Sequence, residues 1–212
     1  VLDMNGTYLR LLAERRLITY ELLCASGPRG VYIADDQTLS IMVNGTDHIA
    51  IRATLSGGLD EAWRAVCLAD DALGAILNFT YHERLGYLTS ALRAVGTGLK
   101  LGALLHLPAL ALSGRMNAAE ELATSRGLVL RGLALGDPRS VDSGPGASGL
   151  QCGITPDIEP DSMQSLFLDV LGDLAATPGQ SVGNLFLLGN HDTLGISERE
   201  LIIHGESAIN EI

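Results

Sequence analysis

The sequence predicts an α+β fold in which a largely antiparallel sheet is flanked by helices. Short alternating segments cluster between helical segments, without a regular strand–helix–strand repeat. The chain has 212 residues, 47% of them hydrophobic and 18% charged, which suits a folded protein better than a disordered one. This length is sufficient for one core, so we expect a single domain over residues 1–212.

In the first half of the chain, the periodicity of the apolar residues separates helices from strands. Two segments carry apolar residues at helical spacing, 8–17 and 59–77, and Thr19 can begin a short helix between them. Three segments alternate like strands with one buried face: 31–34, 38–43 and 48–55. The first two strands are expected to form a hairpin. In the helix over 59–77, we expect the core side chains to be Trp63, Val66, Leu73 and Leu77.

In the second half, glycine and proline mark the boundaries. Four segments are expected to be extended: 87–89, 99–107, 128–135 and 184–188. Pro108 fits the first turn of a helix that runs towards Arg126, and Gly127 can close it. Ser197 precedes a terminal helix that has two acidic residues in its first turn.

An insertion at about 137–182 differs in composition from the rest. It opens with Gly, Pro and Ser residues typical of a loop, and residues 161–174 then have the spacing of an amphipathic helix. Because the chain starts at Val1, we also expect its N-terminal side to be incomplete.

Charge and cysteine content exclude several classes of protein. The net charge of −11 disfavours nonspecific nucleic-acid binding, which requires clustered Lys and Arg. No apolar run reaches the roughly 18 residues of a membrane span. The three cysteines lack metal-site or disulfide spacing, which indicates a reducing, cytoplasmic location. No metal site is expected.

One long segment carries a family resemblance. Gly86–Lys100, continued by Leu105–Leu110, resembles the signature of the ATP:guanidino phosphotransferases, or phosphagen kinases, and above all of the bacterial protein-arginine kinases. Further matches follow in the same order along the chain, and they cover most of it except the insertion: Glu14–Ile18, Leu39–Val43, Glu61–Trp63, Asp70–Leu73, Gly127–Gly132 and Gly183–Glu198.

The resemblance implies a fold and a reaction. The fold would be the phosphagen-kinase catalytic domain, which is glutamine-synthetase-like. Such a domain transfers the γ-phosphoryl group of ATP, with Mg²⁺ bound through the ATP, to a guanidinium nitrogen. The implied partners are ATP and a guanidino compound or protein arginine, with neither nucleic acid nor membrane, and a homodimer stays open.

Several reactive positions of the family are replaced. The family's Asn-Glu-Glu-Asp-His loop reads Asn44-Gly45-Thr46-Asp47-His48, and the arginine two residues later is Ala50. The family's cysteine loop reads Ser90–Ala94, and the arginine that closes Gly-Thr-Gly-Leu is Lys100. Loss of an acid/base carboxylate costs about 10²–10⁴ in rate, and loss of a transition-state arginine about 10³–10⁵. We therefore expect the activity to be impaired or lost.

Each candidate residue has two interpretations. Asp47 either holds the guanidinium or is a solvated turn residue. Four cations are expected at the ATP phosphates: Arg52, Arg93, Lys100 and Arg131. Arg52 could equally be a surface cation, and Arg131 a structural ion-pair partner. The loop candidates are Asn44, His48, Gly96, Thr97 and Gly98, of which the last three either form a simple turn or present amide groups to an anion. His106, in an apolar run, is expected to be a core histidine.

Three functions remain open at this stage. The chain is an impaired guanidino kinase, or a pseudokinase that binds a partner, for example through the 161–174 helix, or a degraded reading frame with little selected function.

Overall fold

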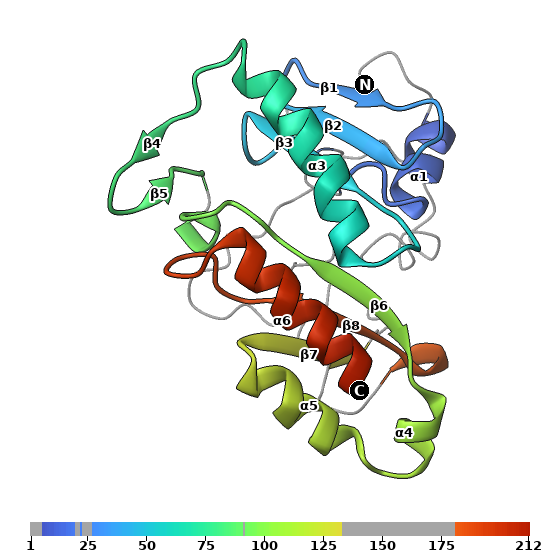
Figure 1. Ribbon diagram of the computed structural model, residues 1–212. Coiled ribbons are helices and arrows are strands. Elements are labelled where there is room, and N and C mark those ends of the chain that lie inside the picture. Colours follow the sequence, from blue (N-terminus) through green and yellow to red (C-terminus); the bar gives the residue numbers. More distant parts are fainter. Residues whose placement is uncertain (1–5, 20–21, 23–26, 91, 133–180) are drawn as a thin grey trace, which may run out of the picture. The chain divides into compact units, whose positions relative to one another are not determined.

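The computed structural model describes residues 6–19, 22, 27–90, 92–132 and 181–212 (Figure 1). The chain divides into two compact units, one formed by 1–54 with 135–169 and the other by 55–134 with 170–212. Both combine antiparallel strands with helices, which confirms the predicted α+β class. The predicted helix over 161–174, and nearly all of the insertion, lie outside the described residues.

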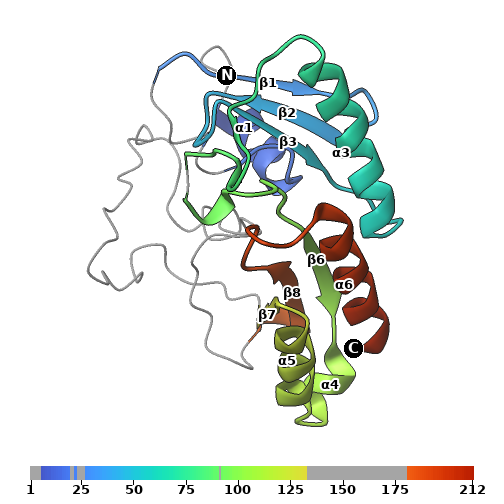
Figure 2. The ribbon, with the colours of Figure 1, turned by 60° about the vertical axis from the view of Figure 1, so that its left-hand side comes forward.

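The first unit contains an antiparallel sheet in the order β1-β2-β3. Its strands are β1 (Gly30–Ile33), β2 (Leu39–Val43) and β3 (Ile49–Ala53). The predicted hairpin is confirmed, with the register Ile33↔Ser40 next to its turn. Helix α1 (Gly6–Glu14) lies against one face of this sheet (Figure 2). The shared core consists of Leu12, Leu17, Ile18, Leu22 and Met42. Leu22 N donates to Thr19 Oγ1 at 3.2 Å, whereas the short helix predicted after Thr19 lies mostly outside the described residues.

The second unit contains a sheet in the order β6-β8-β7, antiparallel throughout. Its strands are β6 (Gly102–His106), β8 (Leu185–Asn190) and β7 (Leu128–Gly132). β8 lies in the centre although it comes last, so it pairs with residues that lie between 54 and 87 positions earlier in the sequence. This unit also contains a short hairpin of β4 (Tyr81–His82) and β5 (Gly86–Tyr87). It contains two 3-10 turns as well, η1 (Leu92–Ala94) and η3 (Val182–Asn184).

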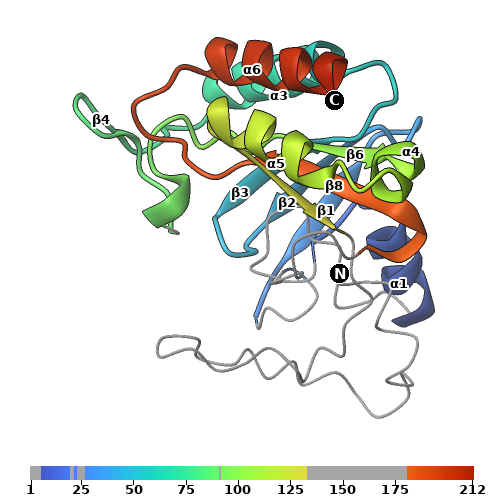
Figure 3. The ribbon, with the colours of Figure 1, turned by 90° about the horizontal axis from the view of Figure 1, so that it is seen from below.

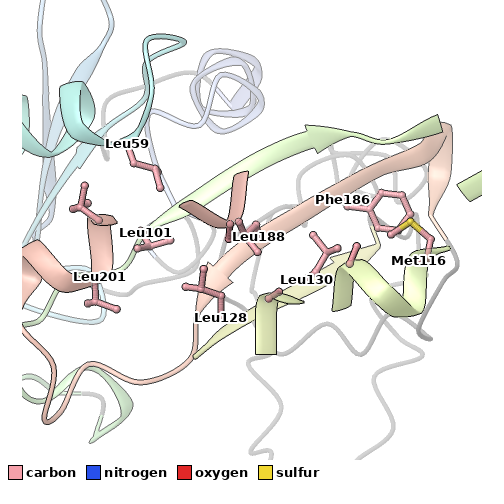
Figure 4. Close-up of a cluster of buried hydrophobic side chains, with 12 residues drawn as sticks. Leu59, Leu101, Met116, Leu128, Leu130, Phe186, Leu188 and Leu201 are labelled. Carbon is pink, nitrogen blue, oxygen red and sulfur yellow. The ribbon is translucent and has the colours of Figure 1, made fainter. Parts of the chain in front are cut away.

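Helices α5 (Met116–Ser125) and α6 (Glu198–Glu211) cover one face of the β6-β8-β7 sheet. The unit also contains α3 (Leu59–Gly74) and α4 (Pro108–Leu112). Alternate residues of β7 and β8 point to α5 and α6 and form the core with Leu101, Met116 and Leu201 (Figure 4). Helix α3 lies beside α6 (Figure 3).

Three sequence expectations in this unit are wrong. The single helix predicted from Pro108 to Arg126 is two helices, because Gly114 adopts a left-handed φ of 69° and ends α4. His106 is exposed, since β6 alternates and places it with Leu104 on the face away from the core. Leu77 likewise lies beyond the end of α3 and is 37% exposed.

Candidate functional site

The glycine turn of the signature segment packs backbone against backbone. Gly96 N donates to Tyr87 O at 3.1 Å, and Tyr87 N donates to Gly96 O at 2.8 Å. Gly96 has a φ of 120°, and a methyl group there would collide with the carbonyl oxygen of Thr193. Glycine is therefore required at this position by both conformation and space.

Thr193 anchors this turn from the end of β8. Its side chain is 2% exposed, and its Oγ1 donates to Val95 O at 2.7 Å. Its carbonyl accepts from Thr97 N at 3.1 Å, while Thr97 Oγ1 accepts from Leu99 N at 3.2 Å. The amides of Gly96, Thr97 and Leu99 thus donate within the protein, which favours the turn interpretation over an anion site made of these three groups.

Asn190 holds the next stretch of the segment. Its amide is 5% exposed, and Oδ1 accepts from Leu101 N at 2.8 Å. Its Nδ2 donates to Leu99 O at 3.1 Å and to Asp192 O at 3.0 Å. The oxygen and the NH₂ group of this amide therefore both have partners. Lys100 lies between Leu99 and Leu101, two of the three residues that the Asn190 amide binds.

Lys100 and Arg131 lie on the same side of the second unit. Leu128 and Leu130 of β7 point into the core, so Arg131 belongs to the opposite face, where it pairs in register with Leu187. Leu99 packs on the core and Leu101 belongs to it, so Lys100 points away from it. Both cations are half-buried, and they face the side of the sheet that α5 and α6 leave uncovered.

Arg93 belongs to the same continuous segment. It lies in η1, three residues before Gly96, and its neighbour Ala94 is 4% exposed. Of the ten predicted site residues, the second unit thus contains Arg93, Gly96, Thr97, Gly98, Lys100 and Arg131. Gly98 is exposed, with a left-handed φ of 66°.

The other four predicted residues belong to the first unit. Asn44, Asp47 and His48 form the β2–β3 connection, which Asn44 N closes by donating to His48 O at 3.0 Å. Asn44 adopts a φ of 57°, which asparagine tolerates better than most residues, and its Nδ2 donates to Pro28 O at 2.9 Å. Asp47 is half-buried and His48 is exposed. The loop therefore presents one carboxylate.

Arg52 makes a hydrogen bond inside the first unit. It lies on β3 opposite Ser40, on the face that α1 covers, and its Nη1 donates to Arg16 O at 3.4 Å. Arg16 follows the end of α1 with a φ of 59°, where carbonyl groups lack helical partners. The guanidinium of Arg52 thus helps to close α1, which is a structural role that the sequence did not suggest.

In the part of the chain that the structure describes, no group of three or more His, Cys, Asp or Glu side chains could hold a metal ion. Among the same residues no helix is both long and apolar enough to cross a membrane. A shallow hollow on α5 carries none of the predicted site residues; it is lined by Asn117, Glu120, Glu121, Thr124 and Ser125.

Sequence reasoning missed the two residues that hold the site together. Asn190 lies beyond the predicted strand over 184–188, and Thr193 entered only as part of a matching segment, although both are buried polar residues that follow an apolar run. A buried Asn or Thr needs hydrogen-bond partners, so their position was the available signal. Their partners lie about 90 residues earlier, which no local pattern reveals.

Comparison with known proteins gives a consistent result. The profile of "ATP:guanido phosphotransferase, C-terminal catalytic domain" matches residues 3–144. A protein-arginine kinase of Desulforamulus reducens is 32% identical over 201 residues, which are 94% of this chain and 45% of that protein. Another, of Symbiobacterium thermophilum, is 41% identical over 125 residues, or 58% of this chain and 35% of its own length. This chain thus spans less than half of these relatives.

Solved structures agree in fold. A duplicated taurocyamine kinase from Schistosoma mansoni with bound transition state analog components superposes with a TM-score of 0.63 at 17% identity, and it covers 100% of this chain and 25% of its own. A lombricine kinase superposes with a TM-score of 0.58 at 16% identity, over 100% of this chain and 50% of its own. Both likenesses support the predicted phosphagen-kinase fold.

Proposed function

The chain belongs to the ATP:guanido phosphotransferase family, and from that premise we propose that it binds Mg-ATP and a guanidinium, with phosphoryl transfer impaired or lost. The relatives named protein-arginine kinase support a protein arginine as the guanidinium. A free guanidino compound is the other member of the same chemical class.

The observation that carries the proposal is the shared orientation of Lys100 and Arg131. Both cations face the side of the β6-β8-β7 sheet opposite to α5 and α6. A triphosphate needs several positive charges held in fixed positions. Arg131 lies on a strand and Lys100 in a segment that Asn190 holds by hydrogen bonds, so little conformational entropy would be lost when they bind phosphate. Arg93, in the turn that precedes Gly96, would be a third cation of this group.

Mg²⁺ would arrive with the nucleotide. Because the described residues offer no cluster of three acidic, His or Cys side chains, the ion is expected to be held by phosphate oxygens and water. When bound, Mg²⁺ would neutralise part of the phosphate charge. The side chains of Lys100 and Arg131 would then orient the remaining oxygens.

The residues that would bind the guanidinium are consistent with low turnover. A guanidinium stays protonated at neutral pH, so a carboxylate must orient it and help to remove a proton. Asp47 is the carboxylate of the β2–β3 connection, where Gly45 and Thr46 stand instead of the family's glutamates. Asp47 would therefore hold the guanidinium without the second acid/base group that efficient transfer needs.

A second candidate is a pseudokinase that binds arginine-bearing partners without turnover. The replacement of the family's arginine by Ala50 on β3 favours it, because this removes charge stabilisation that is needed only in the transition state. Ground-state binding by Asp47 and Lys100 would then persist. The two candidates differ only in whether phosphoarginine forms.

The test combines titration calorimetry with Mg-ATP and a transfer assay with radiolabelled ATP and an arginine-rich protein. Lys100→Met and Arg131→Met should each weaken ATP binding by about tenfold to a hundredfold, as expected for hydrogen bonds to charged groups. Arg199→Met, an exposed cation on α6, is the matched control and should change little.

Three outcomes of this test distinguish the impaired kinase from the pseudokinase. Slow transfer that Asp47→Ala abolishes supports the impaired kinase. Binding of ATP with no transfer supports the pseudokinase. Absence of ATP binding at millimolar concentration rejects both.

A further inference from the structure

The ladder between β6 and β8 ends in an unusual way. Backbone pairing runs from His106↔Leu185 to Gly102↔Gly189. At the next position, the side chain of Asn190 takes over from the backbone and binds Leu101 N and Leu99 O, at 2.8 and 3.1 Å. One side-chain amide thus prolongs the ladder along a segment that belongs to no strand.

These two bonds enclose Lys100. Leu99 O belongs to the peptide group before the Cα of Lys100, and Leu101 N belongs to the peptide group after it. Because a peptide group is planar, a hydrogen bond on each of the two groups restrains the φ and ψ angles of Lys100 between them. The amide itself is oriented by its third bond, from Nδ2 to Asp192 O at 3.0 Å.

Burial strengthens this constraint. Asn190 is 5% exposed and Leu101 is 4% exposed, so water competes little for these hydrogen bonds. Leu101 belongs to the buried core cluster that also contains Leu201 (Figure 4). Lys100 therefore leaves a backbone that is held from two sides, and its side chain is directed away from the core.

We propose that Asn190 is a positioning residue for Lys100: its amide sets the direction from which the Lys100 ammonium meets the phosphates of ATP. The inference rests on the proposed function, in which Lys100 contacts ATP. Lysine has a flexible stem of four carbons and lacks the rigid fork of arginine, so it gains more from a fixed Cα. Asn190 itself does not touch the nucleotide.

A purely structural role makes a different prediction. An amide that only stabilises the fold would lower the melting temperature when it is replaced, and would weaken ATP binding equally with or without the lysine. A positioning residue acts through Lys100, so its effect on affinity must disappear when the ammonium is absent. A double-mutant cycle on ATP affinity separates the two.

The experiment uses the 212-residue chain and Mg-ATP calorimetry, with melting temperature measured in parallel. The variants are Asn190→Ala, Lys100→Met and the double variant. We expect Asn190→Ala to weaken ATP binding about tenfold in the presence of Lys100 and less than twofold in the Lys100→Met background.

The matched control is Thr193→Val, which removes the Thr193 Oγ1–Val95 O bond from the same segment but leaves both bonds around Lys100. It should destabilise the fold, and its effect on affinity should be the same with or without Lys100. If Asn190→Ala does not fold, the cycle is repeated with Asn190→Asp, which keeps the acceptor for Leu101 N.

The proposal is supported if the effect of Asn190→Ala on ATP affinity depends on Lys100 while the effect of Thr193→Val does not. Equal effects of Asn190→Ala in both backgrounds overturn it while leaving the ATP site in place. Unchanged affinity in Lys100→Met rejects the phosphate role of Lys100 in the proposed function, and the inference with it. Failure of both Asn190 variants to fold would make Asn190 a folding residue and overturn its positioning role.

Discussion

The carboxylate of Glu206, on α6, caps the start of α3 at Leu59. Its Oε1 accepts from Leu59 N at 2.5 Å and from Asp60 N at 3.3 Å. The N-cap of α3 is Gly58, which has no side chain to satisfy these amides, and the carboxylate also complements the positive end of the helix dipole. One residue of α6 thus determines where its neighbouring helix begins.

Replacing Glu206 should therefore destabilise the second unit. Glu206→Ala leaves two amides of a partly buried helix end without their acceptor, and we expect it to lower the free energy of unfolding by about 2 kcal/mol. Glu206→Gln keeps an oxygen acceptor and should cost about half as much. Urea unfolding measures both, with Glu121→Ala on the exposed side of α5 as a control. Equal stability of Glu206→Ala and Glu121→Ala would contradict the capping role.

Two glycines of the signature turn should differ sharply in their tolerance of a methyl group. Gly96→Ala meets the backbone of Thr193 as well as a φ of 120°, so we expect a loss of about 3 kcal/mol or more. Gly98→Ala has a φ of 66°, but its nearest new neighbour is Thr89 Cγ2 at 3.9 Å, so conformational strain of about 1 kcal/mol is the whole cost. Unfolding curves that gave equal losses would show that close packing at Thr193 is not what fixes Gly96.

Asp70, on α3, should weaken the fold at neutral pH. Partial burial, and then the charges of Asp71 and Glu198, raise the pKa of Asp70 above its usual 3.8. A raised folded-state pKa gives stability that is complete below 3.8 and lost as pH rises through the folded value. Asp70→Asn should therefore raise the melting temperature at pH 7, and this gain should shrink towards pH 4.

Asp36→Asn provides the opposite control. Its hydrogen bonds from the backbone and side chain of Thr38 lower the pKa of Asp36, so its carboxylate stabilises the fold above pH 3.8. That variant should lose stability at pH 7 and lose less of it at acidic pH. A gain of stability for both variants at pH 7 would argue against the assigned causes.

The fold was predictable where local patterns decide it. The β1–β2 hairpin, α3 and the start of α6 follow from alternation, helical spacing and capping residues, and each lies within a few residues of its predicted bounds. The break between α4 and α5 was missed because helical periodicity continues across Ser113 and Gly114. The left-handed conformation of Gly114 lies between the two helices and interrupts them.

The site was predictable in outline only. Family resemblance indicated Lys100 and Arg131, but their common orientation depends on the register of β6 and β7 with β8, which joins distant parts of the chain. The role of Arg52 at the end of α1, and the bonds of Asn190, are tertiary contacts between residues with no shared local pattern. Such contacts become visible only in three dimensions.

The capping box of α6 gives a final prediction about pH. Ser197 Oγ accepts from Glu200 N at 3.3 Å, and the Glu200 carboxylate accepts from Ser197 N at 3.0 Å and from its hydroxyl at 2.8 Å. The bond from the Ser197 backbone, followed by that from its side chain, lowers the pKa of Glu200 below 4.5.

A depressed folded-state pKa gives stability that is present above 4.5 and lost as pH falls through the folded value. Glu200→Gln should therefore lower the melting temperature at pH 7, and the difference from the unmodified chain should narrow below about pH 4. Glu83→Gln, on the exposed β4–β5 turn, has no such bond to lose and serves as the control. A difference for Glu200→Gln that stayed constant from pH 7 to pH 3 would show that its charge does not contribute to the cap.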